Sequence, residues 1–250
     1  MTKHVRHTVL AMRQVIVERG QFKLHIDELS LRQGEIACLV GPNGCGKTTL
    51  LLTALGLLPH TGSCSVLGVP FDGTDPAVKA HIGFIPDDPE LLFAELTARE
   101  QWAVSASVIR RYRKAADTEH LISRSEQLAQ TLLFTPPVQL AREYSHGMRK
   151  KTQIVQALLG SPEVLVVDEL RNGLDPLASK QAEDLLRREC RRGAAVLAAT
   201  HDLWWAERFA DHIYVLHQGR IVAAGTSRQL RKPGEPDLEA AFCRIIEEVS

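Results

Sequence analysis

Residues 36–48 read Ile36-Ala-Cys-Leu-Val40-Gly41-Pro-Asn-Gly-Cys-Gly-Lys47-Thr48. The first five are apolar, which is the form of a short strand buried on both faces of a sheet. The other eight fit the pattern G-x-x-x-x-G-K-[ST] at every fixed position. Glycines at this spacing let backbone N–H groups turn inward as a nest for phosphate oxygens, and the helix that we expect over 48–58 adds the positive end of its dipole. The stretch predicts a phosphate-binding loop between a buried strand and a helix.

Two side chains of this loop have chemical roles in the pattern. Lys47 would reach the outer phosphates of a bound nucleotide, and the Thr48 hydroxyl would take a position on Mg²⁺. A chance glycine-rich turn is the alternative, but the four fixed positions coincide by accident in only about 1% of such chains. We expect the nucleotide to be held by Gly41, Pro42, Asn43, Gly44, Cys45, Gly46, Lys47, Thr48 and Thr49.

A second apolar run ends in two acids, Val164-Leu-Val-Val-Asp168-Glu169. If the run is a strand of the same sheet, the acids lie at its carboxyl edge, where open α/β folds bind ligands. Asp168 would bind Mg²⁺ directly or through water, and Glu169 would polarise an attacking water. Asp-Glu after a strand is by itself most often a solvated turn. The phosphate loop makes the metal and catalytic roles the better interpretation.

The composition is that of a globular protein without bulk charge. Of 250 residues, 44% are hydrophobic and 24% are charged, which excludes a disordered or fibrous chain. Thirty basic residues balance thirty acidic ones, so no nucleic-acid partner is expected. The five cysteines are scattered without a C-x-x-C pair, and the apolar runs are far shorter than the ~20 residues that span a bilayer. We expect a soluble chain in the cytoplasm.

The order of expected strands and helices predicts an α/β fold in three parts. Strands near 9–17 and 22–31 favour an N-terminal antiparallel β subdomain. Residues 86–143 lack strand alternation and are interpreted as an inserted α-helical subdomain, with helices over 97–113 and 119–134. Strands and helices then alternate, which predicts a mainly parallel sheet covered by helices. The remaining elements are expected at 64–67, 82–85, 147–160, 164–167, 176–192, 194–199 and 203–210, before a hairpin of 213–217 and 220–223 and a terminal helix over 238–249.

Three further segments complete a resemblance to a known family. They are Tyr144-Ser145-His146-Gly147-Met148, Gly173-Leu174-Asp175-Pro176 and Thr200-His201-Asp202. Together with the phosphate loop and the acid pair, they make the sequence over about 15–226 resemble the nucleotide-binding subunit of ATP-binding cassette (ABC) transporters. In that family the three segments correspond, in this order, to the signature, the D-loop and the switch-histidine region.

The resemblance implies an ATPase that works as a dimer. Each ATP would be held by the phosphate loop of one subunit and by Ser145, Gly147 and Asp175 of the other. His201 would contact the γ-phosphate from the subunit that supplies Lys47. The implied cofactors are ATP and Mg²⁺, and the implied catalytic residues are Glu169, His201 and Lys47.

The resemblance also implies partners and domain limits. A P-loop NTPase core would form the ATPase domain over 1–232, and 233–250 would be a C-terminal helical extension. The ATP-binding subunits would form a homodimer or a heterodimer and drive a transmembrane permease on a separate chain. The protein would then lie peripherally on the cytoplasmic face of the membrane. Residues 96–100 and the Ser-His-Gly-Met signature look more like those of exporters than of importers.

The sequence departs from the family pattern at three places. Asp87 stands in Ile85-Pro86-Asp87-Asp88-Pro89, where the family has glutamine. A carboxylate can bind Mg²⁺ but cannot donate a hydrogen bond, and a turn residue that faces solvent is the alternative. Leu170-Arg171 replaces Pro-Thr after the acid pair. Where the family stacks an aromatic ring on adenine, Arg19 has the position and Phe22 lies three residues on, so either could stack.

Two other functions remain open at this point. A soluble cassette ATPase without a membrane partner generally carries two cassettes or a long coiled coil, and this sequence predicts neither. A regulatory subunit that holds ATP without hydrolysing it is compatible with Asp87 and Leu170-Arg171, whereas Glu169 argues against it. We interpret His146 as a tolerated surface substitution, and we expect one buried and one exposed ring at Trp204-Trp205.

Overall fold

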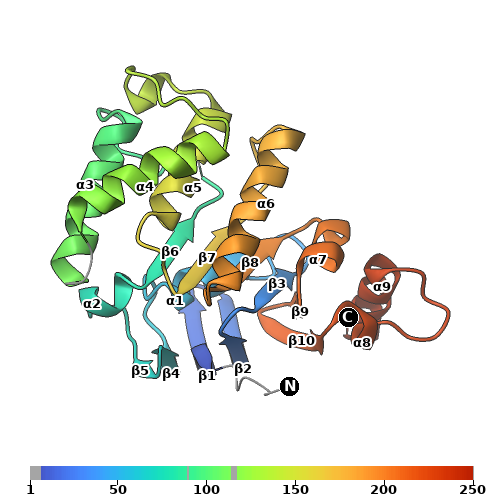
Figure 1. The fold of residues 1–250 in the computed structure, drawn as a ribbon. Coiled ribbons are helices and arrows are strands. Elements are labelled where there is room, and N and C mark those ends of the chain that lie inside the picture. The colour runs from blue at the N-terminus through green and yellow to red at the C-terminus, as the bar shows by residue number, and fades with distance from the viewer. Residues whose placement is uncertain (1–6, 89, 114–116, 250) are drawn as a thin grey trace, which may run out of the picture.

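The computed structural model describes residues 7–88, 90–113 and 117–249. Within these residues, ten strands form one sheet in the order β5-β4-β1-β2-β10-β9-β3-β8-β7-β6 (Figure 1). The strands are β1 (Thr8–Arg19), β2 (Phe22–Arg32), β3 (Ile36–Val40), β4 (Thr61–Val66), β5 (Val69–Pro70), β6 (Ile82–Ile85), β7 (Val164–Asp168), β8 (Ala195–Thr200), β9 (His212–His217) and β10 (Arg220–Gly225). The helices are α1 (Lys47–Ala54), α2 (Pro76–Lys79), α3 (Ala98–Tyr112), α4 (Thr118–Thr131), the 3-10 helix η1 (Ala141–Glu143), α5 (His146–Leu158), α6 (Pro176–Arg191), α7 (Leu203–Phe209), α8 (Ser227–Leu230) and α9 (Leu238–Val249).

A parallel core carries the predicted loop and the acid pair. The strands β6, β7, β8, β3 and β9 pair with one another in parallel, in that order. Every residue of β3, β7 and β8 is buried, as expected of strands with both faces covered. This confirms the buried strands expected over 36–40 and 164–167. Because β3 and β7 run in the same direction, the phosphate loop and Asp168 emerge at the same edge of the sheet.

The antiparallel part continues the same sheet. The strands β1, β2, β4 and β5 pair antiparallel, which confirms the β subdomain. The hairpin of β9 and β10 joins the two parts, because β10 pairs antiparallel with β9 and meets β2 in parallel at Arg220 and His25. Apolar residues of β2 share one core cluster with Leu50 of α1 and Leu197 of β8. The helix that follows the phosphate loop therefore rests on both parts of the sheet.

The helical subdomain consists of α3 and α4 packed on α5 (Figure 1). Its first helix, α3, is capped by Thr97, which exchanges hydrogen bonds with Glu100 in a capping box. The Trp102 ring meets Phe134 edge-on, with centroids 6.3 Å apart. Helix α5 contacts both helices and also β6, although it lies outside the limits of 86–143. It is therefore the element through which the subdomain is fixed to the sheet.

The helix expected over 48–58 is wrong at its C-terminal end. Helix α1 stops at Ala54, and Gly56 takes the left-handed conformation with φ +62°. A side chain at Gly56 would collide with the backbone of Gly73, so glycine is required for the turn. The leucines at 55, 57 and 58 favour a longer helix, and the turn at Gly56 overrides them. The short elements β5, α2 and α8 were not predicted, since two to four residues are too few to show a periodicity.

The C-terminal helix packs on the main core. Leu238, Ala241 and Ile245 of α9 are buried, and the helix contacts α7, α8 and β10. On α7, Trp205 is 3% exposed and Trp204 is 62% exposed, which confirms one buried and one exposed ring. Across the described residues, no helix combines the length and the apolar character needed to cross a membrane.

Candidate functional site

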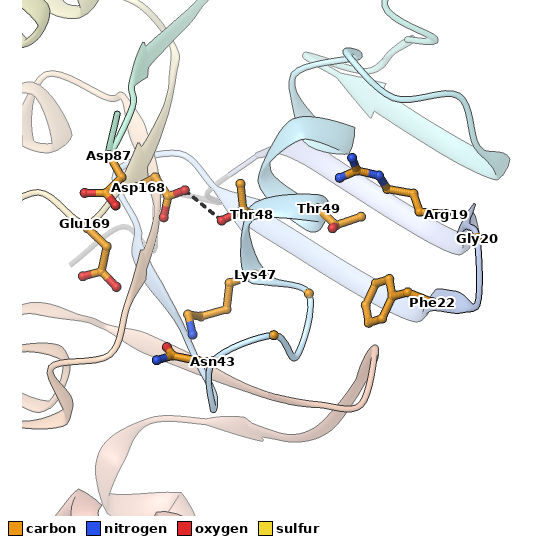
Figure 2. Close-up of a pocket in the computed structure, with 12 residues that line it drawn as sticks. Arg19, Gly20, Phe22, Asn43, Lys47, Thr48, Thr49, Asp87, Asp168 and Glu169 are labelled. Atoms are coloured by element: carbon orange, nitrogen blue, oxygen red, sulfur yellow. Dashed lines mark hydrogen bonds between the residues drawn. The ribbon is translucent and has the colours of Figure 1, made fainter. Parts of the chain in front are cut away.

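A cavity of about 820 Å³ lies over the predicted loop at the carboxyl edge of the sheet. Figure 2 shows its two walls: Asp87, Asp168 and Glu169 on one side, and Arg19 and Phe22 on the other, with the loop and α1 between them. The cavity thus brings together most of the residues predicted for nucleotide and Mg²⁺. The predicted residues on its wall are Arg19, Phe22, Asn43, Gly44, Gly46, Lys47, Thr48, Thr49, Asp87, Asp168 and Glu169.

Two predicted loop residues that do not line the cavity, Gly41 and Cys45, contact β9 and the turn after it. A Cβ on Gly41 would collide with the Leu216 carbonyl oxygen of β9, so only glycine allows this approach. The Gly219 N–H, in the turn after β9, donates to the Cys45 carbonyl oxygen at 2.9 Å. Burial raises the pKa of the Cys45 thiol, and the nearby Lys47 charge opposes this shift. The hairpin of β9 and β10 therefore braces the phosphate loop.

The Lys47 ammonium lies over the loop. It donates to the carbonyl oxygens of Gly41 at 2.7 Å and Pro42 at 3.2 Å, and Figure 2 shows it beside Asn43. The turn into α1 passes through Gly46, whose φ of +110° is a conformation that glycine adopts without strain. The arrangement places one positive charge and the N-terminus of α1 at the same end of the cavity. Both favour a bound anion.

Thr48 and Asp168, two residues predicted for Mg²⁺, lie next to each other. The Thr48 hydroxyl donates to Asp168 Oδ2 at 3.1 Å, a bond between α1 and the end of β7 (Figure 2). Burial raises the pKa of Asp168; the Thr48 bond opposes this shift, and the charges of Asp87 and Glu169 add to it. In the described part of the chain, no three His, Cys, Asp or Glu side chains form a closed metal cluster. A hydroxyl and one or two carboxylates fit Mg²⁺, which takes its other ligands from water and phosphate.

Asp87 lies on the cavity wall, on the segment that leads from β6 to the helical subdomain. Its Oδ1 accepts a hydrogen bond of 2.8 Å from Asn172 Nδ2, which lies between the acid pair and α6. The carboxylate therefore shares the cavity with Asp168 and Glu169. Pro89 of the same segment lies outside the described residues.

Glu169 is held by the last residue of β8, Thr200, and by His201, which follows this strand. Its Oε1 accepts from the backbone N–H of His201 at 3.0 Å and from His201 Nδ1 at 2.8 Å, while Oε2 accepts from the Thr200 hydroxyl at 3.1 Å. Glu169 has a φ of +45°, so the backbone turns sharply directly after Asp168. The carboxylate and the imidazole thus form one hydrogen-bonded pair, in which Glu169 lines the nucleotide cavity while His201 lines a second cavity of about 200 Å³ that Glu169 also touches.

The departure at Leu170-Arg171 links two loops. Leu170 is buried in the main core, and Arg171 donates to Asp202 Oδ2 at 2.8 Å. Asp202 in turn accepts from the Trp205 N–H at the start of α7. The arginine therefore connects the loop after the acid pair to the segment that carries His201.

Both candidates for base stacking lie on the same wall. Arg19 ends β1 and Phe22 begins β2, so the tight turn between these strands presents both side chains to the cavity (Figure 2). The Phe22 ring lies against Gly46, where an added Cβ would come within 2.7 Å of Phe22 Cζ. Either planar side chain can accept a purine face.

The residues predicted to contact ATP from the other subunit of the dimer lie elsewhere. Ser145, Gly147 and Asp175 line a separate cavity of about 440 Å³. Ser145 accepts from the Met148 N–H at the start of α5, and Asp175 accepts from the Ala178 N–H at the start of α6. This last bond lowers the pKa of Asp175. One chain alone does not bring these residues to the cavity with Lys47. His146 is exposed, as expected.

Sequence reasoning missed Lys150. Its side chain is fully buried on α5, and its Nζ donates to the Pro86 carbonyl oxygen at 2.6 Å and to the Asp168 carbonyl oxygen at 3.2 Å. Burial lowers the pKa of Lys150 to about 8, although Asp87, Asp168 and Glu169 all act to raise it. In the sequence it is the middle of Arg149-Lys150-Lys151, which is typical of a solvated helix face.

The comparisons with known proteins identify a family for the chain. A family model described as "ABC transporter" matches residues 24–172. The chain is 31% identical over 205 residues to the ABC-type transporter ATP-binding protein EcsA of Bacillus subtilis, and the match covers 81% of each chain. It is 36% identical over 206 residues to the Nod factor export ATP-binding protein I of Neorhizobium galegae, with 81% of this chain and 58% of that one covered. It is 31% identical over 213 residues to the bacitracin transport ATP-binding protein BcrA of Bacillus licheniformis, with 84% and 67% covered.

Solved structures give the same fold. An ATP-binding subunit of an ABC transporter superposes with a TM-score of 0.87 at 27% identity, over 96% of this chain and 100% of that one. The fold, with its phosphate loop between β3 and α1, defines a P-loop nucleotide-binding protein. Within that class, the chain belongs to the ABC transporter family and is one of its nucleotide-binding subunits.

Proposed function

We propose that the protein hydrolyses ATP to drive export through a transmembrane subunit on a separate chain. The observation that carries the proposal is the hydrogen bond from His201 to Glu169, whose carboxylate lies on the cavity wall with Thr48 and Asp168. The export direction rests on a relative named for Nod factor export and on the signature segment. A relative named for bacitracin transport supports transport without a direction.

The residues of the cavity divide the work of hydrolysis. Lys47 and the N–H groups of the loop would neutralise the phosphates, where charge builds up in the transition state. Glu169 would take a proton from the attacking water, and His201 would hold the carboxylate in place through Nδ1. Thr48, Asp168 and Asp87 would hold Mg²⁺, whose charge offsets that of the β- and γ-phosphates when it is bound.

A second copy, or a related subunit, would complete the site. In one chain the Ser145 and Gly147 segment lines its own cavity, and it begins a helix whose N-terminus suits an anion. Head-to-tail pairing would bring this segment of one subunit over the phosphate loop of the other. A dimeric ATP-binding cassette with ADP and phosphate has the same fold as this chain, with a TM-score of 0.76.

An apolar groove suits the membrane subunit. A cavity of about 560 Å³ lies between β6 and α3, and its wall includes Leu91 and Phe93, each 61% exposed. Val108 of α3, 52% exposed, extends the apolar wall. We propose that a cytoplasmic segment of the transmembrane subunit fills this groove, which would place the protein on the cytoplasmic face of the membrane. The groove adjoins the segment that carries Asp87, so binding of the partner would be coupled to the nucleotide site.

A subunit that binds ATP without hydrolysis is the second candidate. It is favoured by Asp87, since a third carboxylate beside Asp168 and Glu169 replaces an amide of the family pattern. Phosphate release decides between the two. The purified protein, with its transmembrane subunit in lipid, should release phosphate from MgATP, and the matched Glu169→Gln complex should not. Binding of ATP without release above the Glu169→Gln level would establish the second candidate instead.

A further inference from the structure

The Lys150 ammonium lies between two parts of the nucleotide site that come from distant segments. Its two bonds join the carbonyl oxygen of Pro86, directly before Asp87, to that of Asp168 at the end of β7. The side chain is fully buried. A buried ammonium is costly unless hydrogen bonds and opposite charges compensate it, so this residue needs an explanation beyond helix packing.

Helix α5 holds the same segment at a second point. Gln153, three residues after Lys150 and on the same helix face, donates from Nε2 to the Asp88 carbonyl oxygen at 2.8 Å. Between these two contacts the Asp87 side chain is bonded to Asn172. The segment that presents Asp87 to the cavity is thus held by three hydrogen bonds, two from α5 and one from Asn172.

The charges around Lys150 point to the metal site. Asp87, Asp168 and Glu169 line one wall of the cavity, and their mutual repulsion would drive them apart. The ammonium lies behind this wall and attracts all three carboxylates. Its positive charge thus acts on the carboxylate that stands where the family pattern has a neutral amide.

We propose that Lys150 is a positioning residue, which holds the Asp87 carboxylate at a fixed place beside Asp168 so that both can serve one Mg²⁺. The proposal rests on the proposed function. It has a consequence for the dimer, because α5 begins at the Ser145 segment, and Lys150 lies little more than one turn further on. The helix therefore connects the part that would contact ATP across the dimer to the carboxylates of the chain's own site.

The test measures how much Mg²⁺ strengthens ATP binding. A fluorescent ATP analogue is titrated into the purified protein with Mg²⁺ and with EDTA. The dissociation constant in EDTA is divided by the one in Mg²⁺, and this ratio is compared among variants. Loss of an outer residue that orients a metal ligand commonly weakens metal affinity 10–100-fold. Lys150→Met should therefore lower the ratio by about tenfold or more. Lys150→Arg, which keeps the charge and the donors, should bring the ratio back toward the wild-type value.

Trp102→Phe is the matched control. Trp102 is buried in the same subdomain, and its Nε1 donates to the Thr152 carbonyl oxygen of α5 at 3.1 Å, away from the carboxylates. This variant should lower the melting temperature but leave the ratio unchanged. The proposal fails if Lys150→Met keeps the wild-type ratio, if Trp102→Phe lowers it equally, or if Lys150→Arg stays as low as Lys150→Met. If the wild-type protein binds no ATP at all, it is the proposed function that fails.

Discussion

The Thr48 hydroxyl donates a hydrogen bond of 3.1 Å to Asp168 Oδ2, although 120 positions separate the two residues in the chain. The bond joins the first turn of α1 to the last residue of β7. The two oxygen atoms that the sequence predicts for Mg²⁺ are therefore neighbours before any ligand is bound. Such preorganisation reduces the cost of ordering the site when the nucleotide enters.

Asp168→Asn should make the nucleotide-free protein more stable at neutral pH. Burial and the carboxylates of Asp87 and Glu169 raise the pKa of Asp168, so its charged form is disfavoured in the folded state. A carboxyl group whose pKa is higher in the folded than in the unfolded protein lowers the free energy of unfolding as the pH rises from the unfolded to the folded pKa. Asparagine does not ionise, so the variant avoids this loss. We expect a melting temperature higher by about 2–4 °C, the effect of ~1 kcal/mol in a domain of this size.

Two further measurements on Asp168→Asn test whether its gain in stability comes from removal of the charge or from a change in packing. The difference in melting temperature should shrink as the pH falls through the pKa of Asp168, because the wild-type side chain then becomes neutral as well. The variant should also lose the strengthening of ATP binding by Mg²⁺. A gain in stability that is the same at all pH values would contradict the electrostatic explanation.

Lys47→Ala should lose ATP binding and hydrolysis together. The ammonium is the charge placed over the phosphate loop, and its removal leaves the phosphates poorly matched. Equilibrium binding of a fluorescent nucleotide is the measurement, and Lys180→Ala, an exposed lysine of α6, is the control. An unchanged affinity in Lys47→Ala would show that the loop has been assigned wrongly.

Glu169→Gln should bind MgATP but hydrolyse it at least about 100-fold more slowly, the contribution typical of a general base. The amide oxygen can still accept from the Thr200 hydroxyl or from His201, so the loop keeps its conformation. Because ATP is bound and not consumed, the variant should accumulate as a dimer in size-exclusion chromatography with MgATP. Hydrolysis at the wild-type rate would exclude Glu169 as the base.

Asp87→Gln should reduce the Mg²⁺ dependence of ATP binding. The carboxylate lies on the cavity wall with Asp168, where its charge is favourable beside a cation and repels a metal-free triphosphate. The variant should therefore bind ATP more tightly than the wild type in EDTA. Titrations with Mg²⁺ and with EDTA measure both effects, and an identical metal dependence would place Asp87 outside the site.

Alkylation should distinguish one cysteine from the other four. Cys243 on α9 is exposed, whereas Cys38, Cys45, Cys64 and Cys190 are buried. Burial raises the pKa of the Cys64 thiol to about 11 and that of Cys190 to about 12, so their thiolates are scarce at neutral pH. Mass spectrometry after brief treatment with iodoacetamide should find one adduct, at Cys243, and five after unfolding in guanidinium. Equal rates at all five positions would contradict the described packing.

The sequence by itself determined the phosphate loop, because a loop of this kind is a local structure. Its glycines set the backbone conformation, its lysine and threonine follow at fixed spacing, and the apolar run 36–40 before it has the composition of a buried strand. The acid pair was predicted in a similar way, because the apolar run 164–167 before it also has the composition of a buried strand. Parallel strands of one sheet end at one edge, so the two motifs had to meet there.

Only the tertiary structure decided how the distant side chains are paired. The bond between Glu169 and His201, and the one between Asp87 and Asn172, depend on how loops fold after their strands. Lys150 is the clearest example of a contact that the sequence does not show, because Arg149-Lys150-Lys151 is uniformly basic. Their chemistry is alike, but successive residues of a helix point about 100° apart. Helical periodicity places Lys150 in line with the buried Ile154 and Leu158, but only the packing of α5 on β6 brings its ammonium to the carbonyl oxygen of Pro86.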